Sequence, residues 1–251
     1  MRIMRVRTPE GEVVYGRAEG DLLLVHGGDP FGDFAPTGRA WPLAEVALLA
    51  PVEPSKIVVV GRNYPRPGEA AFAGGEPLIL MKPATTVIGP GEAIVRPPEV
   101  TRLKLEAELA VVIGRRARHV SAEDAPAHVL GYTVANDLGA VDIMEKDGQW
   151  VRGKSYDTFC PLGPAVVTGL DPSDLLITCR VNGRECQRAS TAEMFHSVAR
   201  LVAFASRVMT LPPGDVIVTG TPPGAVEVVP GDLIEMEIAG IGRLANPVVA
   251  G

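Results

Sequence analysis

The sequence is short of cysteine and of long apolar runs. Its three cysteines, Cys160, Cys179 and Cys186, are odd in number and lack the paired close spacing of a zinc knuckle, which argues against a zinc site and a disulfide framework. We therefore expect a reducing, cytoplasmic location. No segment approaches the ~18 uninterrupted apolar residues that a membrane helix needs, and residues 1–16 lack the apolar core of a signal peptide. Neither membrane insertion nor secretion is expected.

An excess of basic charge is absent as well. The 24 Lys and Arg residues are outnumbered by 30 Asp and Glu, which gives a formal net charge of −6, and the basic residues form no long run. A protein that coats nucleic-acid phosphates needs the opposite balance. We therefore expect a small-molecule partner and no nucleic acid.

Short Val- and Ile-rich runs, separated by 28 glycines and 23 prolines, dominate the chain. This pattern is typical of a strand-rich protein. Helical periodicity is present only at 122–129, after a candidate cap at Ser121, and at 191–209. The predicted fold class is mostly β with few helices (α+β). The clearest expected strands are 56–60, 109–113, 129–135, 166–168 and 216–219.

The chain of 251 residues is at the upper end of what one hydrophobic core serves. Residues 1–50 contain alternating stretches at 4–7 and 21–26, which predict a small N-terminal β domain. The proline-bounded segment 51–54 is a candidate linker, so the second domain is expected to cover 51–251. In that domain, the Pro- and Gly-rich loop 64–75 is either a lid or a surface loop.

Two carboxylates stand at the start of an apolar run. Glu106 and Glu108 occupy positions i and i+2 before Leu109, so their side chains point to one face of the expected strand. Two like charges about 7 Å apart at the mouth of a buried strand repel unless a cation neutralises them. Asp137, which ends the apolar run 129–135, adds a third carboxylate. The three predict a site for Mg²⁺ or Mn²⁺; the alternative is a solvated strand end.

Two further segments carry candidate catalytic groups. Lys154 lies in a polar stretch before a Pro-Gly turn, and the alternative is an ordinary surface lysine. Residues 214–222 are typical of a strand followed by a threonine, Thr221, whose amide and hydroxyl are suited to a carboxylate or an oxyanion. The alternative is a plain transition from strand to turn.

Collectively these motifs resemble the fumarylacetoacetate hydrolase family, which includes acylpyruvate hydrolases, oxaloacetate decarboxylases and 2-hydroxyhepta-2,4-diene-1,7-dioate isomerases. The resemblance covers most of residues 56–247, and TGRAWPL at 37–43 is similar to part of a small β domain that some bacterial members carry. The matching segments are KIVVVGRNY at 56–64, EAEL at 106–109, GYT at 131–133, ND at 136–137, GKS at 153–155, VNG at 181–183 and TGTP at 219–222.

The resemblance implies a rolled, mixed β structure and a homodimer. It also implies that Glu106, Glu108 and Asp137 bind the cation, that Lys154 contacts the substrate or its enolate, and that Thr221 holds the substrate carboxylate. Beside these, we expect Arg62, Asn63, Tyr64 and Gly220 to be substrate-binding positions.

The sequence departs from the family pattern in the loop after Tyr64. Members that hydrolyse a carbon–carbon bond usually carry a His and a Glu there, which activate water. Pro67 and Ala70 stand at those two positions in this chain. Glu69 is one residue out of register and is the candidate acid–base residue of this loop.

A second departure follows Asp137. Many members have an arginine and a glutamine that reach the substrate where this chain has Val141 and Met144. We therefore expect lower polarity on that side of the site. Arg62 or Arg152 is the candidate replacement for the lost cation, and the alternative is that both are solvated.

These features predict a divalent-metal-dependent enzyme that acts on 2-oxo or 2-hydroxy-dienoic carboxylic acids. A metal that stabilises an enolate supports decarboxylation, while isomerisation or tautomerisation also needs one proton carrier, Lys154 or Glu69. Hydrolysis of acylpyruvates needs an activated water and is the activity most affected by the departures. The alternative is a pseudoenzyme that binds a metal and a small acid without turnover.

Overall fold

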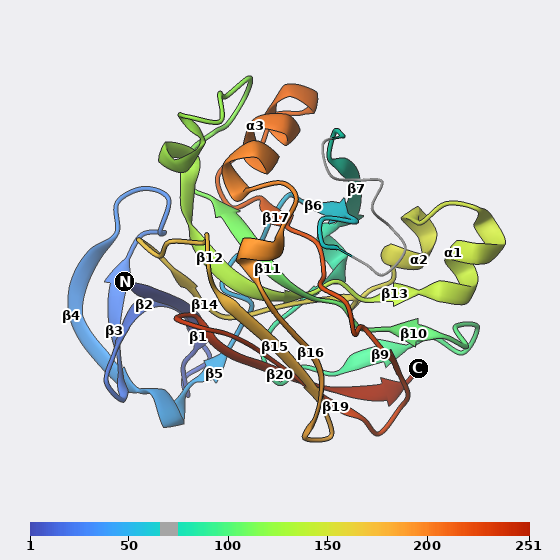
Figure 1. The fold of residues 1–251 in the computed structure, drawn as a ribbon. Coiled ribbons are helices and arrows are strands. Elements are labelled where there is room, and N and C mark those ends of the chain that lie inside the picture. The colour runs from blue at the N-terminus through green and yellow to red at the C-terminus, as the bar shows by residue number, and fades with distance from the viewer. Residues whose placement is uncertain (66–74) are drawn as a thin grey trace.

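One long sheet joins the N-terminal strands to those of the larger module (Figure 1). The computed structural model describes residues 1–65 and 75–251. Within the long sheet, neighbouring strands are antiparallel, except that β17 lies parallel to β6 and β14 parallel to β8. In order across the sheet, the strands are β4 (Ala35–Pro42), β3 (Leu22–Gly27), β2 (Val13–Glu19), β1 (Arg2–Arg7), β14 (Cys160–Val167), β12 (Val129–Asn136), β11 (Ala107–Ile113), β17 (Val216–Val218), β6 (Lys56–Gly61) and β7 (Leu78–Pro83), with β5 (Ala47–Leu48) beside β1 and β8 (Val87–Ile88) beside β14.

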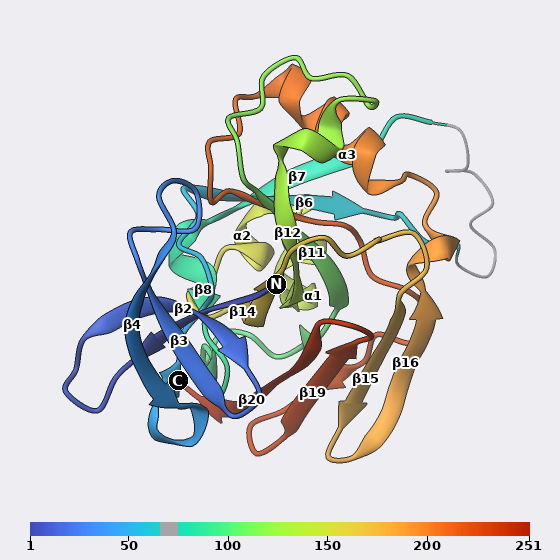
Figure 2. The same cartoon turned by 90° about the vertical axis from the view of Figure 1, so that its left-hand side faces the viewer.

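Two smaller sheets complete the β structure, and Figure 2 shows most strands of the larger one below β6, β7, β11 and β12 of the long sheet. The larger contains β16 (Arg184–Ser190), β15 (Leu176–Val181), β19 (Leu233–Ile238), β20 (Gly242–Ala250) and β9 (Ile94–Arg96). The smaller contains β13 (Gly139–Ala140), β10 (Leu103–Lys104) and β18 (Glu227–Val228). The predicted fold class, a rolled mixed β structure with few helices, is confirmed, and so are the five strands expected in the larger module.

The core is built on both sides of β11. Leu109 and Val111 belong to the largest apolar cluster, which includes residues of β15 and of the helix 198–208, while Ala110 and Val112 pack with residues of β6 and β14. A strand buried on both faces has a nearly continuous apolar sequence, as LAVVI has. A carboxylate carried by this strand is therefore held on a rigid element.

The N-terminal strands have a small core of their own but share the long sheet. Val6, Leu23 and Val25 form an apolar cluster with Ala165 of β14. Arg2 of β1 lies opposite Val167 of β14. Residues 1–50 therefore extend the sheet of the larger module.

The described α-helices are short: α1 (Val141–Asp147), α2 (Val151–Lys154) and α3 (Val198–Val208). At the start of α3, the Ser197 hydroxyl accepts a hydrogen bond from the Arg200 N–H. The sequence did not predict α1 and α2, because one or two turns are too short to establish a helical period. Gly148, with a φ of 65°, ends α1 in the left-handed conformation and allows the turn toward α2.

Both predicted helices needed correction. Over 122–129, an α-helix is wrong: the chain forms a 3₁₀ turn, Ala125–His128, and then enters β12, where Val129 pairs with Ile113. Over 191–209, only Val198–Val208 is α-helical. The Phe195 and His196 N–H groups donate to Asn63 instead of to a helical carbonyl, so this tertiary contact prevents an earlier helix start.

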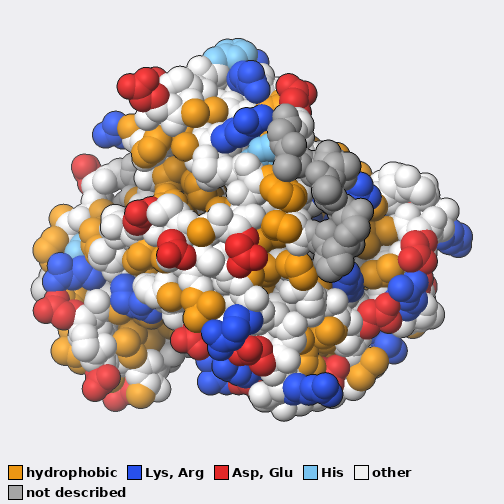
Figure 3. Space-filling view, in the orientation of Figure 1, with side chains coloured by type: hydrophobic (Ala, Val, Ile, Leu, Met, Phe, Trp, Pro, Cys, Tyr) orange, Lys and Arg blue, Asp and Glu red, His pale blue; other side chains and the backbone are white. Residues whose placement is uncertain are grey.

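The surface seen in Figure 3 mixes both signs of charge. Lys and Arg side chains alternate with Asp and Glu over this face and are not gathered into one patch. No helix among the described residues is long and apolar enough to cross a membrane.

Asp215 anchors the start of β6 to β17. The residue is fully buried; its Oδ1 accepts hydrogen bonds from the Ser55 N–H at 3.0 Å and the Ser55 hydroxyl at 2.7 Å, and its Oδ2 pairs with Lys56. We predict that Asp215→Ala lowers the free energy of unfolding by about 2–4 kcal/mol, because it removes a buried carboxylate that accepts hydrogen bonds from Ser55 and pairs with Lys56. Urea denaturation measures this. The exposed control Glu53→Ala should change stability by less than about 1 kcal/mol, and equal effects would contradict the prediction.

Candidate metal centre and active-site cavity

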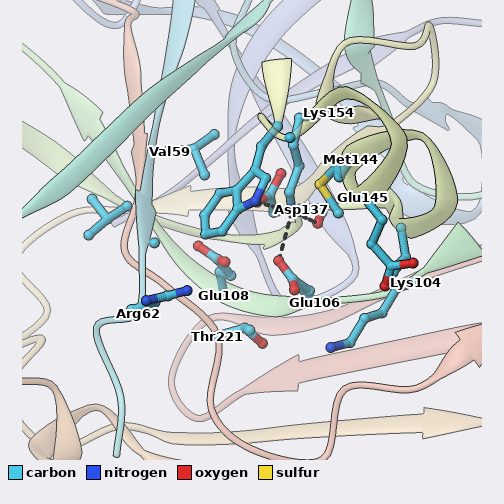
Figure 4. A pocket seen from close by; sticks show the side chains of 15 residues that line it. Val59, Arg62, Lys104, Glu106, Glu108, Asp137, Met144, Glu145, Lys154 and Thr221 are labelled. Carbon is cyan, nitrogen blue, oxygen red and sulfur yellow. Dashed lines mark hydrogen bonds and ion pairs between the residues drawn. The ribbon is translucent and has the colours of Figure 1, made fainter. Parts of the chain in front are cut away.

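Three carboxylates from two adjacent strands meet at one point (Figure 4). Glu106 directly precedes β11, Glu108 lies within it, and Asp137 directly follows β12. Because β11 and β12 are antiparallel, with Ala107 opposite Asn136, the start of one strand lies beside the end of the other. One oxygen from each of the three carboxylates lies within 4.8 Å of the other two. The structure thus brings together the three ligands expected from the sequence.

Burial makes this concentration of negative charge unfavourable without a cation. Glu108 and Asp137 are each only 1% exposed. Burial, together with the nearby Asp137 and Glu106, raises the pKa of Glu108 well above its usual range. A divalent ion such as Mg²⁺ or Mn²⁺ binds carboxylate oxygens and would remove this penalty, so the donor set fits such an ion. A site without His or Cys ligands does not suit zinc.

Two buried lysines contact the carboxylates. Lys154, at the end of α2, donates to Glu106 Oε2 at 2.7 Å and to Asp137 Oδ2 at 2.6 Å. Lys82 of β7 pairs with the other oxygen of Asp137 and donates to the Leu138 carbonyl at 2.8 Å. Burial acts to raise the pKa of Asp137. The ammonium groups of Lys154 and Lys82 together lower it by more, so the pKa of Asp137 is lower than usual. Lys154 is 4% exposed and is therefore not a surface lysine.

The segment after β17 holds Glu108 from the other side. The Gly220 N–H donates to Glu108 Oε2 at 2.7 Å. Gly220 has a φ of +100°, and a Cβ there would lie 2.7 Å from the Asn63 Cβ, so a side chain is excluded. The Thr221 hydroxyl donates to the Ala107 carbonyl at 3.0 Å and accepts from Gln187 at 2.9 Å. Thr221 is thereby fixed at the cavity, and its role toward a substrate carboxylate stays a prediction.

A cavity of about 410 Å³ opens over the carboxylates. One side is apolar, with Val141, Met144 and Trp150 contributed by α1 and the turn before α2. Lower polarity on that side is what the sequence led us to expect. The other described lining residues are Val59, Val60, Gly61, Arg62, Lys104, Glu106, Glu108, Asp137, Glu145, Gly148, Lys154 and Thr221.

Two family models match nearly the whole chain. Residues 56–249 match the model described as fumarylacetoacetate (FAA) hydrolase C-terminal, and residues 1–51 match one described as Rv2993c-like, N-terminal. The chain belongs to the fumarylacetoacetate hydrolase family. The first match contains the three carboxylates of the cation site together with Lys154 and Thr221.

Similar proteins of the fumarylacetoacetate hydrolase family carry several activities in their names. The structure of 5-carboxymethyl-2-hydroxymuconate delta-isomerase from Mycobacterium smegmatis is 46% identical, covers 100% of both chains and has a TM-score of 0.95. The human mitochondrial oxaloacetate tautomerase FAHD2A is 44% identical over 83% of this chain and 71% of that protein. Maleylpyruvate hydrolase from Sphingobium sp. SYK-6, solved with manganese(II) and pyruvate, is 33% identical over 100% of both chains, with a TM-score of 0.83. This chain is an enzyme of the same family.

The three residues after β6 that we expected to bind substrate differ in whether they reach the cavity. Arg62 lines the cavity, with its guanidinium carbon 6.0 Å from the ring centroid of Trp150. Asn63 and Tyr64 are buried and are not among the described lining residues. The Asn63 amide donates to the carbonyls of Thr219 and His196 and so supports the neighbouring backbone.

The remaining candidate residues are Arg152 and those of the loop after Tyr64. Arg152 pairs with Asp147 and is not among the described lining residues, so the structure does not place it as the replacement cation. Pro67, Glu69 and Ala70 lie outside the described residues. The proposed lid and its acid–base residue therefore remain predictions.

Sequence reasoning missed Lys82, Lys104 and Gln187. Gln187 accepts from the Ala107 N–H and donates to Thr221, so it connects β11 to the segment after β17. The partners of Lys82 and Gln187 are far away in sequence, and no local pattern identifies them. The position of Lys104 could have been predicted from the sequence, because Lys104 extends the alternation of Glu106 and Glu108 by one step and so belongs to the same face.

We predict that Glu108→Gln weakens Mn²⁺ binding by at least about 100-fold, because it removes one anionic ligand of three; loss of a mere supporting group already costs about 10- to 100-fold. Isothermal titration calorimetry measures the affinity. The control is Glu145→Gln, which removes a carboxylate that lines the same cavity but lies outside the cluster. If both variants bound Mn²⁺ like the wild type, the assignment of the cation site would be wrong.

Proposed function

We propose that this enzyme is a divalent-cation-dependent tautomerase or isomerase of 2-oxo carboxylic acids, with oxaloacetate as the first substrate to test. The observation that carries the proposal is the carboxylate triad joined by the Lys154 ammonium at the base of a small cavity. Its volume of about 410 Å³ suits a small acid. The names of the isomerase and tautomerase relatives support the same reaction class.

Glu106, Glu108 and Asp137 would hold the cation, for which we propose Mg²⁺ or Mn²⁺. Manganese accompanies pyruvate in the Sphingobium relative. When bound, such an ion acts as a Lewis acid toward a 2-oxo acid and makes its enolate more accessible.

The protein groups supply charge, orientation and exclusion of water. Lys154 presents a buried ammonium beside two of the carboxylates, where it stabilises negative charge that develops on an enolate oxygen. The apolar side formed by Val141, Met144 and Trp150 limits water around the carbon that gains or loses the proton. Thr221 is proposed to hold the substrate carboxylate.

Tautomerisation fits this set of residues better than hydrolysis. It moves one proton between carbon and oxygen, and one acid–base group, Lys154 or Glu69, suffices. Hydrolysis needs a base that activates water, and the described lining of the cavity contains no histidine. Decarboxylation of a 2-oxo diacid stays within the reach of the same site, since it needs mainly an electron sink.

We predict that the enzyme accelerates keto–enol interconversion of oxaloacetate with Mg²⁺ or Mn²⁺, and that EDTA abolishes the acceleration. Enol absorbance follows the reaction against an enzyme-free control at the same metal concentration, and NMR distinguishes pyruvate formed by decarboxylation. Lys154→Met should lower kcat by about 10²–10⁴-fold, because it removes a charge that acts on the transition state.

The other activities of the family are assayed in parallel with a hydroxymuconate-type diacid and an acylpyruvate. Tight metal-dependent binding of oxalate without turnover of any substrate would contradict the proposal and favour the pseudoenzyme. Faster acylpyruvate hydrolysis than tautomerisation would place the enzyme with the hydrolases instead.

We also propose a cytoplasmic homodimer, as the cysteine content and the family resemblance led us to expect. Light scattering on the purified protein should give twice the chain mass of 26.5 kDa. A mass of one chain would contradict the dimer.

A further inference from the structure

The segment before β11 presents a lysine on the same face as the metal-binding carboxylates. Leu103, Leu105 and Ala107 are fully buried in the core. The alternate residues Lys104, Glu106 and Glu108 all line the cavity, as strand alternation requires. Lys104 is thus one step of about 7 Å from Glu106 along the chain. Its position on this face is set by the same register that sets the ligands.

The carboxylates around Lys104 are occupied by another residue. Arg102 donates to Glu227 Oε1 at 2.8 Å and to Glu145 Oε2 at 2.9 Å. Glu227 lies opposite Lys104 in the β10–β18 pair, and Glu145 lines the cavity. Across residues 1–65 and 75–251, the Lys104 ammonium forms no ion pair. A half-buried cation at the cavity is therefore available to an anion that enters it.

The other cations at or near the cavity have different surroundings. Lys154 and Lys82 contact the metal-binding carboxylates themselves. Arg62 lies against the Trp150 ring, and Figure 4 shows it across the carboxylates from Lys104. Arg152 pairs with Asp147. Lys104 is thus the described lining residue best placed to bind an anionic group beyond the carboxylate cluster.

The apolar side chains that line the cavity cannot perform this role. Val141, Met144 and Trp150 provide no positive charge. A second carboxylate of a substrate placed against them would be desolvated by apolar atoms, which is unfavourable. A carboxylate directed toward Lys104 would instead gain a charge-assisted hydrogen bond.

We propose that Lys104 binds the second carboxylate of a dicarboxylic substrate and selects diacids over monoacids of the same length. This inference rests on the proposed function, since it assumes that the 2-oxo acid end lies at the metal-binding carboxylates. Lys104 is a specificity residue: it acts on binding of the far end of the substrate and leaves the reacting atoms to the cation site and Lys154.

The test compares oxaloacetate with 2-oxobutanoate, which has a methyl group in place of the second carboxylate. Exchange of the C3 hydrogens for deuterium, followed by NMR with Mg²⁺, reports enolisation of both acids. Lys104→Met should lower kcat/KM for oxaloacetate by about 10- to 100-fold, as expected for loss of a hydrogen bond between charged groups. The value for 2-oxobutanoate should change less than about twofold, because that acid makes no such bond.

Calorimetry with Mn²⁺ provides a second measurement that does not depend on turnover. Wild type should bind oxaloacetate more tightly than 2-oxobutanoate, Lys104→Met should remove the difference, and the affinity for oxalate should not change. The matched control is Lys146→Met, a lysine on α1 that is not among the described lining residues. It should leave all three affinities as in the wild type.

The outcomes separate this inference from the proposed function. If the wild type enolises neither acid, the proposed function fails, and the binding preference still decides the role of Lys104. An equal loss for oxaloacetate and 2-oxobutanoate in Lys104→Met would overturn the inference, because Lys104 would then hold a group common to both acids. A diacid preference that survives Lys104→Met but disappears in Arg62→Met would also overturn it.

Discussion

The accumulation of negative charge at Glu106, Glu108 and Asp137 is the constraint on which the rest of the site depends. Two of these carboxylates have almost no exposure to water, so each raises the free energy of the others. The protein offsets this with groups from distant parts of the chain: Lys82, Lys154 and the Gly220 N–H. A divalent cation held there would offset the remainder and make the cluster a reactive centre.

The fold holds the three carboxylates in fixed positions, in or directly beside buried strands. β11 lies inside the sheet with its whole length buried, and the Asp137 N–H donates to the Glu106 carbonyl at 2.9 Å. Gln187 connects Ala107 to Thr221. A set of ligands fixed in this way keeps its spacing when the cation or substrate leaves, which is the preorganisation that electrostatic stabilisation requires.

The cavity above the cation site has two chemically different sides. Val141 and Met144 make one side apolar, whereas Lys104 and Arg62 add positive charge elsewhere. Under the proposal made for Lys104, substrate choice would be decided beyond the three carboxylates, by residues that lie outside the reacting centre. The sequence showed the loss of polar groups at 141 and 144, but it pointed to Arg152 as one candidate replacement, and Arg152 pairs with Asp147 instead.

By itself, the sequence determined the strand-rich class, the strands 56–60 and 109–113, and the three carboxylates, because alternation and apolar runs are local properties of the chain. Only the tertiary structure decided where the helix after Thr191 begins, since the N–H groups of Phe195 and His196 are taken by Asn63. It also decided that Lys82 lies beneath Asp137, 55 residues away. Such pairings depend on which strands become neighbours, and no local pattern encodes that.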